Sequence, residues 1–123
     1  NAPFFGNPEM GIEIAKILKG EASADIVYEN KYVLCIKDLY PKAPIHILIM
    51  PKAKFSNILD FSVNASIDEK AGIFESFEKI INTYDLKKKG CRIITNFGEH
   101  GRQEVPHLHF HLLAGQDIGS MIR

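Results

Sequence analysis

Residues 107–113, His-Leu-His-Phe-His-Leu-Leu, place a histidine at every second position and an apolar residue in each gap. Strict alternation is the period of a β-strand, in which successive side chains point to opposite faces. The pattern therefore predicts a strand with one imidazole face and one core face. The imidazole face consists of His107, His109 and His111, and the core face of Leu108, Phe110 and Leu112.

The composition is that of an ordinary globular protein. The 123 residues fit one domain, with 46% hydrophobic and 24% charged residues. Because 15 basic residues balance 15 acidic ones, no net charge draws the chain to nucleic acid or to a membrane. No apolar run approaches the roughly 20 residues of a membrane span, and the first residues lack the pattern of a signal peptide. We expect free cysteines at Cys35 and Cys91, both in strands, and a cytoplasmic protein.

Periodicity and capping signals divide the chain into two helices and five strands. Asn7-Pro8-Glu9 is a typical helix start, Gly20 a helix end, and Ser66 with Glu69 a capping box. The expected helices span residues 8–19 and 67–85, and the expected strands 26–28, 32–36, 45–50, 91–97 and 107–113. These elements predict an α+β fold with an antiparallel sheet. We expect one domain over 1–123, which includes a short N-terminal segment 1–6 and a C-terminal tail 115–123.

The expected helix 67–85 carries two adjacent apolar stripes. One stripe consists of Ile67, Ala71, Phe74 and Ile81, and the other of Ile73, Phe77, Ile80 and Tyr84. Such an arc is wider than contact with one sheet requires. It indicates either a contact with a second subunit or a broad core stripe.

The histidine row limits how a metal can bind. Residues i and i+4 of a strand are about 13 Å apart, whereas Zn–N bonds measure about 2 Å, so the three histidines cannot share one ion. Two of them together with His46 or His100 could do so. A lone histidine such as His46, in the apolar strand 45–50, is usually a hydrogen-bonded core residue. We predict no metal and no cofactor.

Nucleophilic catalysis fits the row better than metal binding. A neutral imidazole attacks with one nitrogen when an acceptor holds its other N–H group. Neighbouring imidazoles disfavour one another's protonation, so that a cluster stays neutral near pH 7. The middle ring, His109, is the natural nucleophile, and the outer rings can bind an anion or carry a proton. A phosphorus centre suits such a site, and acyl transfer is less favoured because no nucleophile-elbow motif is present.

His-Leu-His-Phe-His-Leu-Leu resembles the alternating signature of the histidine triad (HIT) family, and further segments are similar to its Hint branch. These segments are 16–21, 26–29, Asp38 with Pro41 to His46, Pro51-Lys52 and 103–105. The resemblance implies a HIT-like fold with a five-stranded antiparallel sheet and two main helices. It also implies a homodimer that joins two sheets into ten strands through the second helix and the fourth strand.

The same resemblance implies a hydrolase that cleaves purine nucleoside phosphoramidates and aminoacyl adenylates, releasing AMP or GMP. His109 matches the nucleophile, His107 and His111 the other triad members, and His46 a fourth histidine near the leaving group. Asp38 matches the acid that binds the ribose, Asn96 a side chain near ribose and phosphate, and Ile36 part of the purine wall. Arg102, Gln103 and Glu104 lie in the segment expected to line the phosphate.

The chain departs from the family pattern in the loop before the triad and in the tail. Where many members carry Gly-Gly-Gln-Ser, this chain has Gly101-Arg102-Gln103-Glu104, and Pro106 replaces an aromatic residue. An ionised glutamate only accepts hydrogen bonds, whereas the serine can donate one to the leaving group. Zinc-binding cysteines near the N-terminus, and a Trp-Pro-Pro-Gly ending after the tail, are absent. These differences bear on leaving-group specificity.

Four other functions remain open at this stage. Within the family, the chain could hydrolyse diadenosine polyphosphates or transfer nucleotidyl groups. It could instead be a nucleotide-binding regulatory module, or a metal-binding structural protein.

Overall fold

The computed structural model describes residues 8–122 of the chain, with side chains from residue 13 onward. Its helices are α1 (Pro8–Leu18), α2 (Ile58–Asn64) and α3 (Ile67–Thr83). Its strands are β1 (Ile26–Glu29), β2 (Val33–Lys37), β3 (Ile45–Pro51), β4 (Arg92–Ile94) and β5 (Phe110–Ala114). None of the described helices has both the length and the apolar character that crossing a membrane requires.

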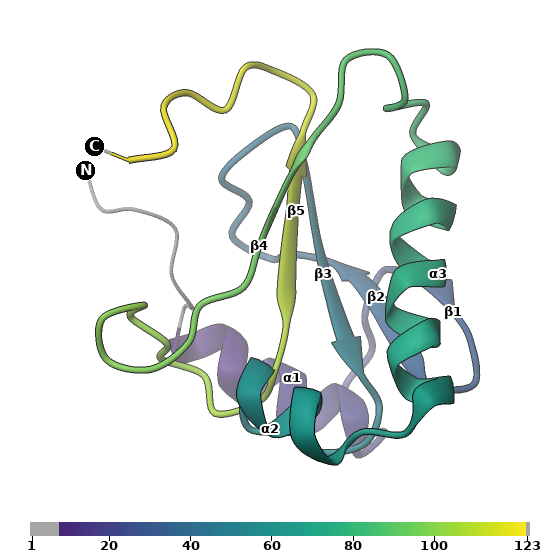
Figure 1. The fold of residues 1–123 in the computed structure, drawn as a ribbon, viewed down its shortest axis with the longest axis vertical. Helices are drawn as coiled ribbons and strands as arrows, with labels where there is room; N and C mark the ends of the chain where they lie inside the picture. Colours follow the sequence, from purple (N-terminus) through teal and green to yellow (C-terminus); the bar gives the residue numbers. More distant parts are fainter. Residues whose placement is uncertain (1–7, 123) are drawn as a thin grey trace.

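The five strands form one antiparallel sheet in the order β1-β2-β3-β5-β4 (Figure 1). The predicted α+β class with an antiparallel sheet is thereby confirmed. β3 lies at the centre, as its apolar sequence predicts, and β5 lies between β3 and β4. The last part of the histidine row therefore has a strand on each side.

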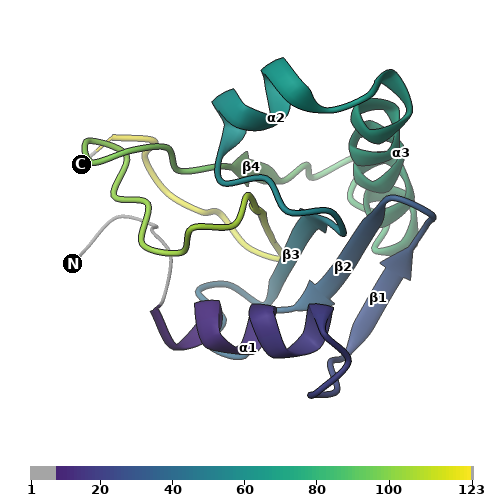
Figure 2. The ribbon, with the colours of Figure 1, turned by 90° about the horizontal axis from the view of Figure 1, so that it is seen from below.

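Helices cover both faces of the sheet, with α2 and α3 on one side and α1 on the other (Figure 2). Alternate residues of the strands supply two apolar clusters, as period-2 geometry requires. The cluster toward α3 includes Val33, Cys35, Ile47, Ile49, Leu108, Phe110 and Leu112. The cluster toward α1 includes Ile14, Leu34, Ile36, Leu48, Met50 and Val105. The predicted core face of the histidine strand is confirmed, and its imidazoles face the α1 side.

Both ends of α3 follow from local sequence. The predicted capping box is present, because Ser66 Oγ accepts from the Glu69 amide at 3.0 Å and Glu69 Oε1 accepts from the Ser66 amide at 2.9 Å. The helix ends at Thr83, two residues before the predicted end. Asp85 there adopts a left-handed conformation (φ 54°), and the Leu86 amide bonds to the Ile81 carbonyl, which closes the last turn.

The end of α1 also agrees with prediction. Gly20 has φ 78°, and the amides of Gly20 and Glu21 donate to the carbonyls of Ile17 and Lys16. This is the Schellman arrangement that a glycine after a helix favours. The expected N-cap Asn7, the segment 1–6 and the side chain of Met10 lie outside the described residues.

Two strand boundaries predicted from the sequence are wrong. The strand predicted over 107–113 begins only at Phe110. Pro106 has no amide N–H to donate to a neighbouring strand. The ring of His107 and the amide of Leu108 donate to the carbonyls of Pro51 and Phe55, outside the sheet ladder. The strand predicted over 91–97 is limited to Arg92–Ile94. Cys91 consequently lies just before β4 and not within a strand.

The sequence analysis also missed α2. Asn57 caps this short helix by accepting from the Asp60 amide at 2.8 Å, and Asp60 accepts in turn from the Ser56 amide. Phe61 of α2 is buried against Phe55 with the rings edge to face. The described residues 8–122 therefore include three helices, and α2 fixes the chain next to the loop that precedes β5.

Candidate active site

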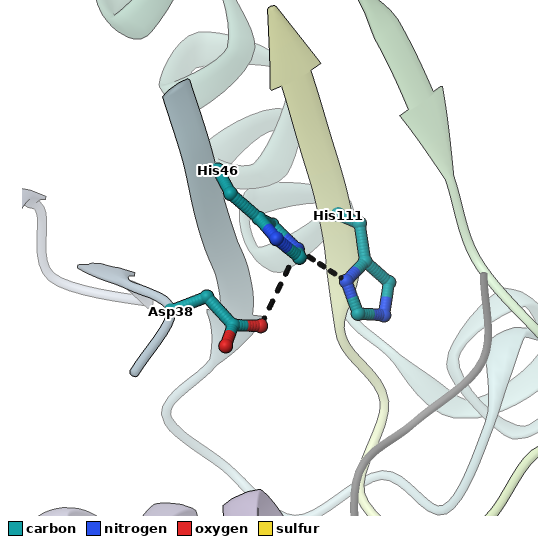
Figure 3. A group of neighbouring side chains, drawn as sticks. All are labelled: Asp38, His46 and His111. Atoms are coloured by element: carbon teal, nitrogen blue, oxygen red, sulfur yellow. Dashed lines mark hydrogen bonds and ion pairs between the residues drawn. The ribbon is translucent and has the colours of Figure 1, made fainter. Parts of the chain in front are cut away.

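Four of the five histidines gather on the α1 side of the sheet, around the junction of β3 and β5. His46 lies on β3 and His111 on β5, where His111 pairs with Leu48. Asp38 follows β2 and points at His46, as Figure 3 shows. His107 and His109 lie in the segment that leads into β5. Three elements distant in sequence thus meet at one cluster, whereas His100 lies in the exposed loop before the triad.

The four clustered histidines are buried, and burial keeps them neutral. Their exposed fractions range from 4% for His111 to 9% for His107. Burial is the main cause that lowers the pKa of each of the four below its ordinary value. The pKa of His111 falls to about 3, with neighbouring His109 and His46 as further causes. All four rings are therefore uncharged near pH 7.

The hydrogen bond made by His109 determines which of its nitrogens is free. Its Nδ1 lies 2.8 Å from the carbonyl oxygen of His107. A carbonyl only accepts, so Nδ1 carries the proton and Nε2 of the neutral ring keeps a lone pair. This is the tautomer that a nucleophilic imidazole requires.

His46 has the opposite arrangement. The Lys42 amide donates to His46 Nδ1 at 3.0 Å, so the proton of the neutral ring is on Nε2. That N–H donates to His111 Nδ1 at 2.9 Å, and Asp38 Oδ2 lies 3.3 Å from the same nitrogen (Figure 3). His46 Nε2 thus contacts both His111 and Asp38, and the three side chains form one polar cluster.

The hydrogen bond from His46 also fixes the tautomer of His111. Because His111 Nδ1 accepts from His46, its proton is on Nε2. That atom is buried and has no hydrogen-bond partner among the described residues. A buried N–H without a partner is costly and is typical of a site that a ligand oxygen or nitrogen completes.

His107 contributes to the site through its backbone as much as through its ring. Its Nε2 lies 3.0 Å from the Pro51 carbonyl oxygen and donates to it, which holds the ring at the end of β3. Its own carbonyl accepts from His109 Nδ1. His107 thereby links the nucleophile candidate to the central strand.

The hydrogen bonds disfavour a metal at the most suitable cluster. Ligand atoms of Asp38, His46 and His111 lie within 4.8 Å of one another, as a metal site requires. However, coordination through His46 Nε2 needs a lone pair there, and the Lys42 amide places the proton on that nitrogen. Binding an ion would break the Lys42 hydrogen bond. The absence of a metal stays a prediction.

Of the predicted ribose and purine residues, Asp38 contacts the histidine cluster. Asp38 Oδ1 accepts from the Tyr40 amide at 2.7 Å, while Oδ2 faces His46. Ile36 is 1% exposed within the apolar cluster toward α1, so it supports the site from beneath. Asn96 is half-buried and lies two residues after β4.

The loop before the triad is folded by its own hydrogen bonds. Gln103 Nε2 donates to the carbonyls of Ser56 at 2.6 Å and Val105 at 3.1 Å, and its Oε1 accepts from the Gly98 amide. The Arg102 amide donates to Glu99, with Arg102 in a left-handed conformation (φ 56°). Glu104 is exposed. Gln103 therefore holds the loop against the start of α2, while the side chains of Arg102 and Glu104 lie at the surface.

One residue at the site was missed by the sequence analysis. Thr95 Oγ1 donates to the carbonyl of His109 at 2.9 Å. Thr95 lies inside the strand that the sequence predicted over 91–97, and this prediction gave no indication that its side chain contacts His109.

Comparisons with known proteins agree with this geometry. The HIT domain family model matches residues 19–118. A purine nucleoside phosphoramidase of Escherichia coli is 37% identical over 109 residues, which cover 88% of this chain and 90% of that protein. An uncharacterised HIT-like protein of Azospirillum brasilense is 41% identical over 108 residues, with 88% of each chain covered.

Solved structures show the same likeness in three dimensions. A histidine triad protein from Clostridium difficile superposes with a TM-score of 0.79 at 37% identity, covering 88% of this chain and 93% of that one. A HIT family hydrolase from Clostridium thermocellum gives a TM-score of 0.79 at 38% identity, covering 90% and 96%. These findings support a hydrolase that acts on nucleotide-related substrates. The chain belongs to the HIT family.

Proposed function

We propose that the protein hydrolyses purine nucleoside 5′-phosphoramidates and aminoacyl adenylates through a covalent nucleotidyl-histidine intermediate, releasing AMP or GMP. The observation that carries this proposal is the tautomer of His109, whose Nδ1–H is donated to the His107 carbonyl. The ring is neutral because burial lowers its pKa. The likeness to the E. coli phosphoramidase supports the substrate class.

The proposed reaction has two displacement steps at the α-phosphorus. In the first, the Nε2 lone pair of His109 forms a bond to phosphorus, and the P–N or P–O bond to the leaving group breaks with its electron pair. The leaving amine takes up a proton from water, whereas a carboxylate leaves without one. In the second, water attacks phosphorus, the P–Nε2 bond breaks, and a proton is released with the nucleotide. Neither step requires a metal.

Asp38, His46 and His111 form the part of the site that can contact the phosphate or the leaving group. We propose that the unpartnered Nε2–H of His111 donates to a phosphate oxygen or to the leaving group. His46 holds this ring in place through the hydrogen bond from its Nε2–H to His111 Nδ1, and Asp38 lies beside the same nitrogen of His46. His107 acts by holding the nucleophile.

The nucleotide contacts are likewise proposals. The side chain of Asp38 is 6% exposed. Its carboxylate has lone pairs beyond those that face Tyr40 and His46, and these can accept hydrogen bonds from ribose hydroxyls. Asn96 is proposed near ribose and phosphate, and Ile36 beneath the purine. Arg102, Gln103 and Glu104 are proposed to line the phosphate and leaving group, with Gln103 acting by fixing the loop.

We propose a homodimer formed through α3 and the edge of the sheet. Phe74 and Ile67 of the first predicted stripe are 71% and 84% exposed, while Ile73 and Ile80 of the other stripe are buried. β4 lies at the edge of the sheet, and its residue Ile93 is 38% exposed. A second copy placed on this surface would cover large apolar side chains and continue the sheet to ten strands.

We also propose a cytoplasmic location. The two cysteines are free, as a reducing compartment requires. Burial raises the pKa of the Cys35 thiol to about 12, which makes it unreactive.

The test is hydrolysis of a fluorogenic AMP–amine conjugate by the purified protein. We expect turnover in the wild type and a covalent nucleotidyl protein after rapid acid quench, and neither in His109→Ala. His100→Ala, which removes the exposed histidine, is the matched control and is expected to keep activity. Turnover that persists in His109→Ala contradicts the proposal. AMP binding without turnover favours a regulatory module, and faster cleavage of diadenosine polyphosphates favours that alternative.

A further inference from the structure

The segment that carries the nucleophile lies outside the regular sheet. Pairing between β4 and β5 ends at Ile94 and His111, and β5 itself begins at Phe110. Residues 107–109 therefore have no ladder to fix their backbone. Their position depends on individual hydrogen bonds.

Three such bonds hold this segment to its surroundings. The Leu108 amide donates to the Phe55 carbonyl at 2.7 Å, and the His107 ring donates to the Pro51 carbonyl at 3.0 Å. The third is the bond from Thr95 Oγ1 to the His109 carbonyl at 2.9 Å. Of these three, the Thr95 bond is the one made to the nucleophile residue itself.

The place of Thr95 in the fold explains why a side chain makes this bond. Thr95 follows directly after Ile94, the last residue of β4. The backbone pairing has already ended there, and the threonine hydroxyl extends the connection from the edge strand to the nucleophile segment. Because threonine is branched at Cβ, its hydroxyl has few rotamers available, so the bond is made at little entropic cost.

We propose that Thr95 is a positioning residue, whose hydroxyl sets the backbone of His109 and thereby the direction of the Nε2 lone pair. The inference rests on the proposed function, in which His109 attacks phosphorus. Rates of attack depend steeply on alignment, and a misplacement of about 1 Å can cost a factor on the order of 100. Substrate binding depends less on this backbone because, of the proposed nucleotide contacts, Ile36 lies on β2 and Asp38 directly follows it. Asn96, next to Thr95, is the one proposed contact that adjoins the segment.

The experiment compares Thr95→Val, Thr95→Ser and Thr83→Val in hydrolysis of the AMP–amine conjugate. Valine keeps the shape of threonine without the hydroxyl, and serine keeps the hydroxyl. Thr83 is the other threonine of the chain and donates to the Lys79 carbonyl at the exposed end of α3, which makes it the matched control. We expect kcat to fall roughly 10- to 100-fold in Thr95→Val with little change in KM. Thr95→Ser and Thr83→Val should stay near the wild-type rate.

The inference is overturned if Thr95→Val keeps the wild-type kcat, or if Thr95→Ser loses as much activity as Thr95→Val. Thr95→Ala replaces the valine variant if that protein does not fold. If the wild type does not cleave the conjugate, the proposed function fails. Imidazole ¹⁵N spectra then test Thr95 separately. A changed His109 resonance in the hydroxyl-free variant, absent in Thr83→Val, supports the role, and an unchanged resonance overturns it.

Discussion

The buried histidine cluster predicts that acid destabilises this protein more than an exposed set of histidines would. His111 is the strongest contributor, being 4% exposed with a pKa of about 3. In the unfolded chain its pKa returns to about 6.5. Between these two values the unfolded state binds a proton that the folded state does not, so stability falls as the pH falls below about 6.5.

The magnitude follows from the two pKa values. One pKa unit corresponds to about 1.4 kcal/mol. Between pH 7 and pH 5 the unfolded His111 becomes protonated while the folded one remains neutral, which costs about 2 kcal/mol. The lowered pKa values of His46, His107 and His109 act in the same direction.

Urea unfolding at pH 7 and pH 5, at one protein concentration, measures this loss. His111→Gln keeps a polar group beside His46 but does not titrate, so its loss between the two pH values should be about 2 kcal/mol smaller than that of the wild type. His100→Gln removes a histidine from an exposed loop without touching the cluster and should lose as much as the wild type. Equal losses in His111→Gln and the wild type would refute the argument.

Two further predictions concern the surface of α3 and the loop before the triad. Phe74→Lys places a charge on the proposed dimer surface and should yield monomers in analytical ultracentrifugation, whereas Lys79→Glu on another side of α3 should remain dimeric. Gln103→Ala removes the bonds to Ser56 and Val105 and should speed amide exchange in residues 98–104, at a cost of about 1 kcal/mol in stability. Gln116→Ala, in the exposed tail, is its control, and unchanged exchange in Gln103→Ala would contradict the assignment.

Much of the fold was predictable because its signals are local. Continuous runs of apolar and β-branched residues gave the strands around Cys35 and Ile47, and the Ser66–Glu69 capping box gave the start of α3. These features act within a few residues and depend little on the rest of the chain. The helix α2 was missed because its seven residues are too few for a clear apolar period, although Asn57 and Asp60 form a recognisable N-cap.

The contacts of the site were less predictable because their partners are backbone groups distant in sequence. The Pro51 carbonyl that holds His107 is 56 residues away, and the His46–His111 bond spans 65 residues. The Lys42 amide is near His46 in sequence. Pro41 and Pro44 indicate irregular backbone between them, but they do not predict that the Lys42 N–H points at His46 Nδ1. Residue types alone therefore indicated the chemistry without assigning a tautomer to any ring.

The difference between His109 and His111 arises where the strand prediction failed. In an uninterrupted strand from 107 to 113 the two rings would be equivalent, and the carbonyl of His107 would point at a neighbouring strand's amide. Because β5 begins only at Phe110, that carbonyl turns toward the ring of His109 and accepts a hydrogen bond from its Nδ1–H. His111, inside the ladder, instead meets the ring of His46 and carries its proton on Nε2. The late start of β5 thus gives one histidine a free lone pair and the next a free N–H, which are the nucleophile and the donor that phosphoryl chemistry needs.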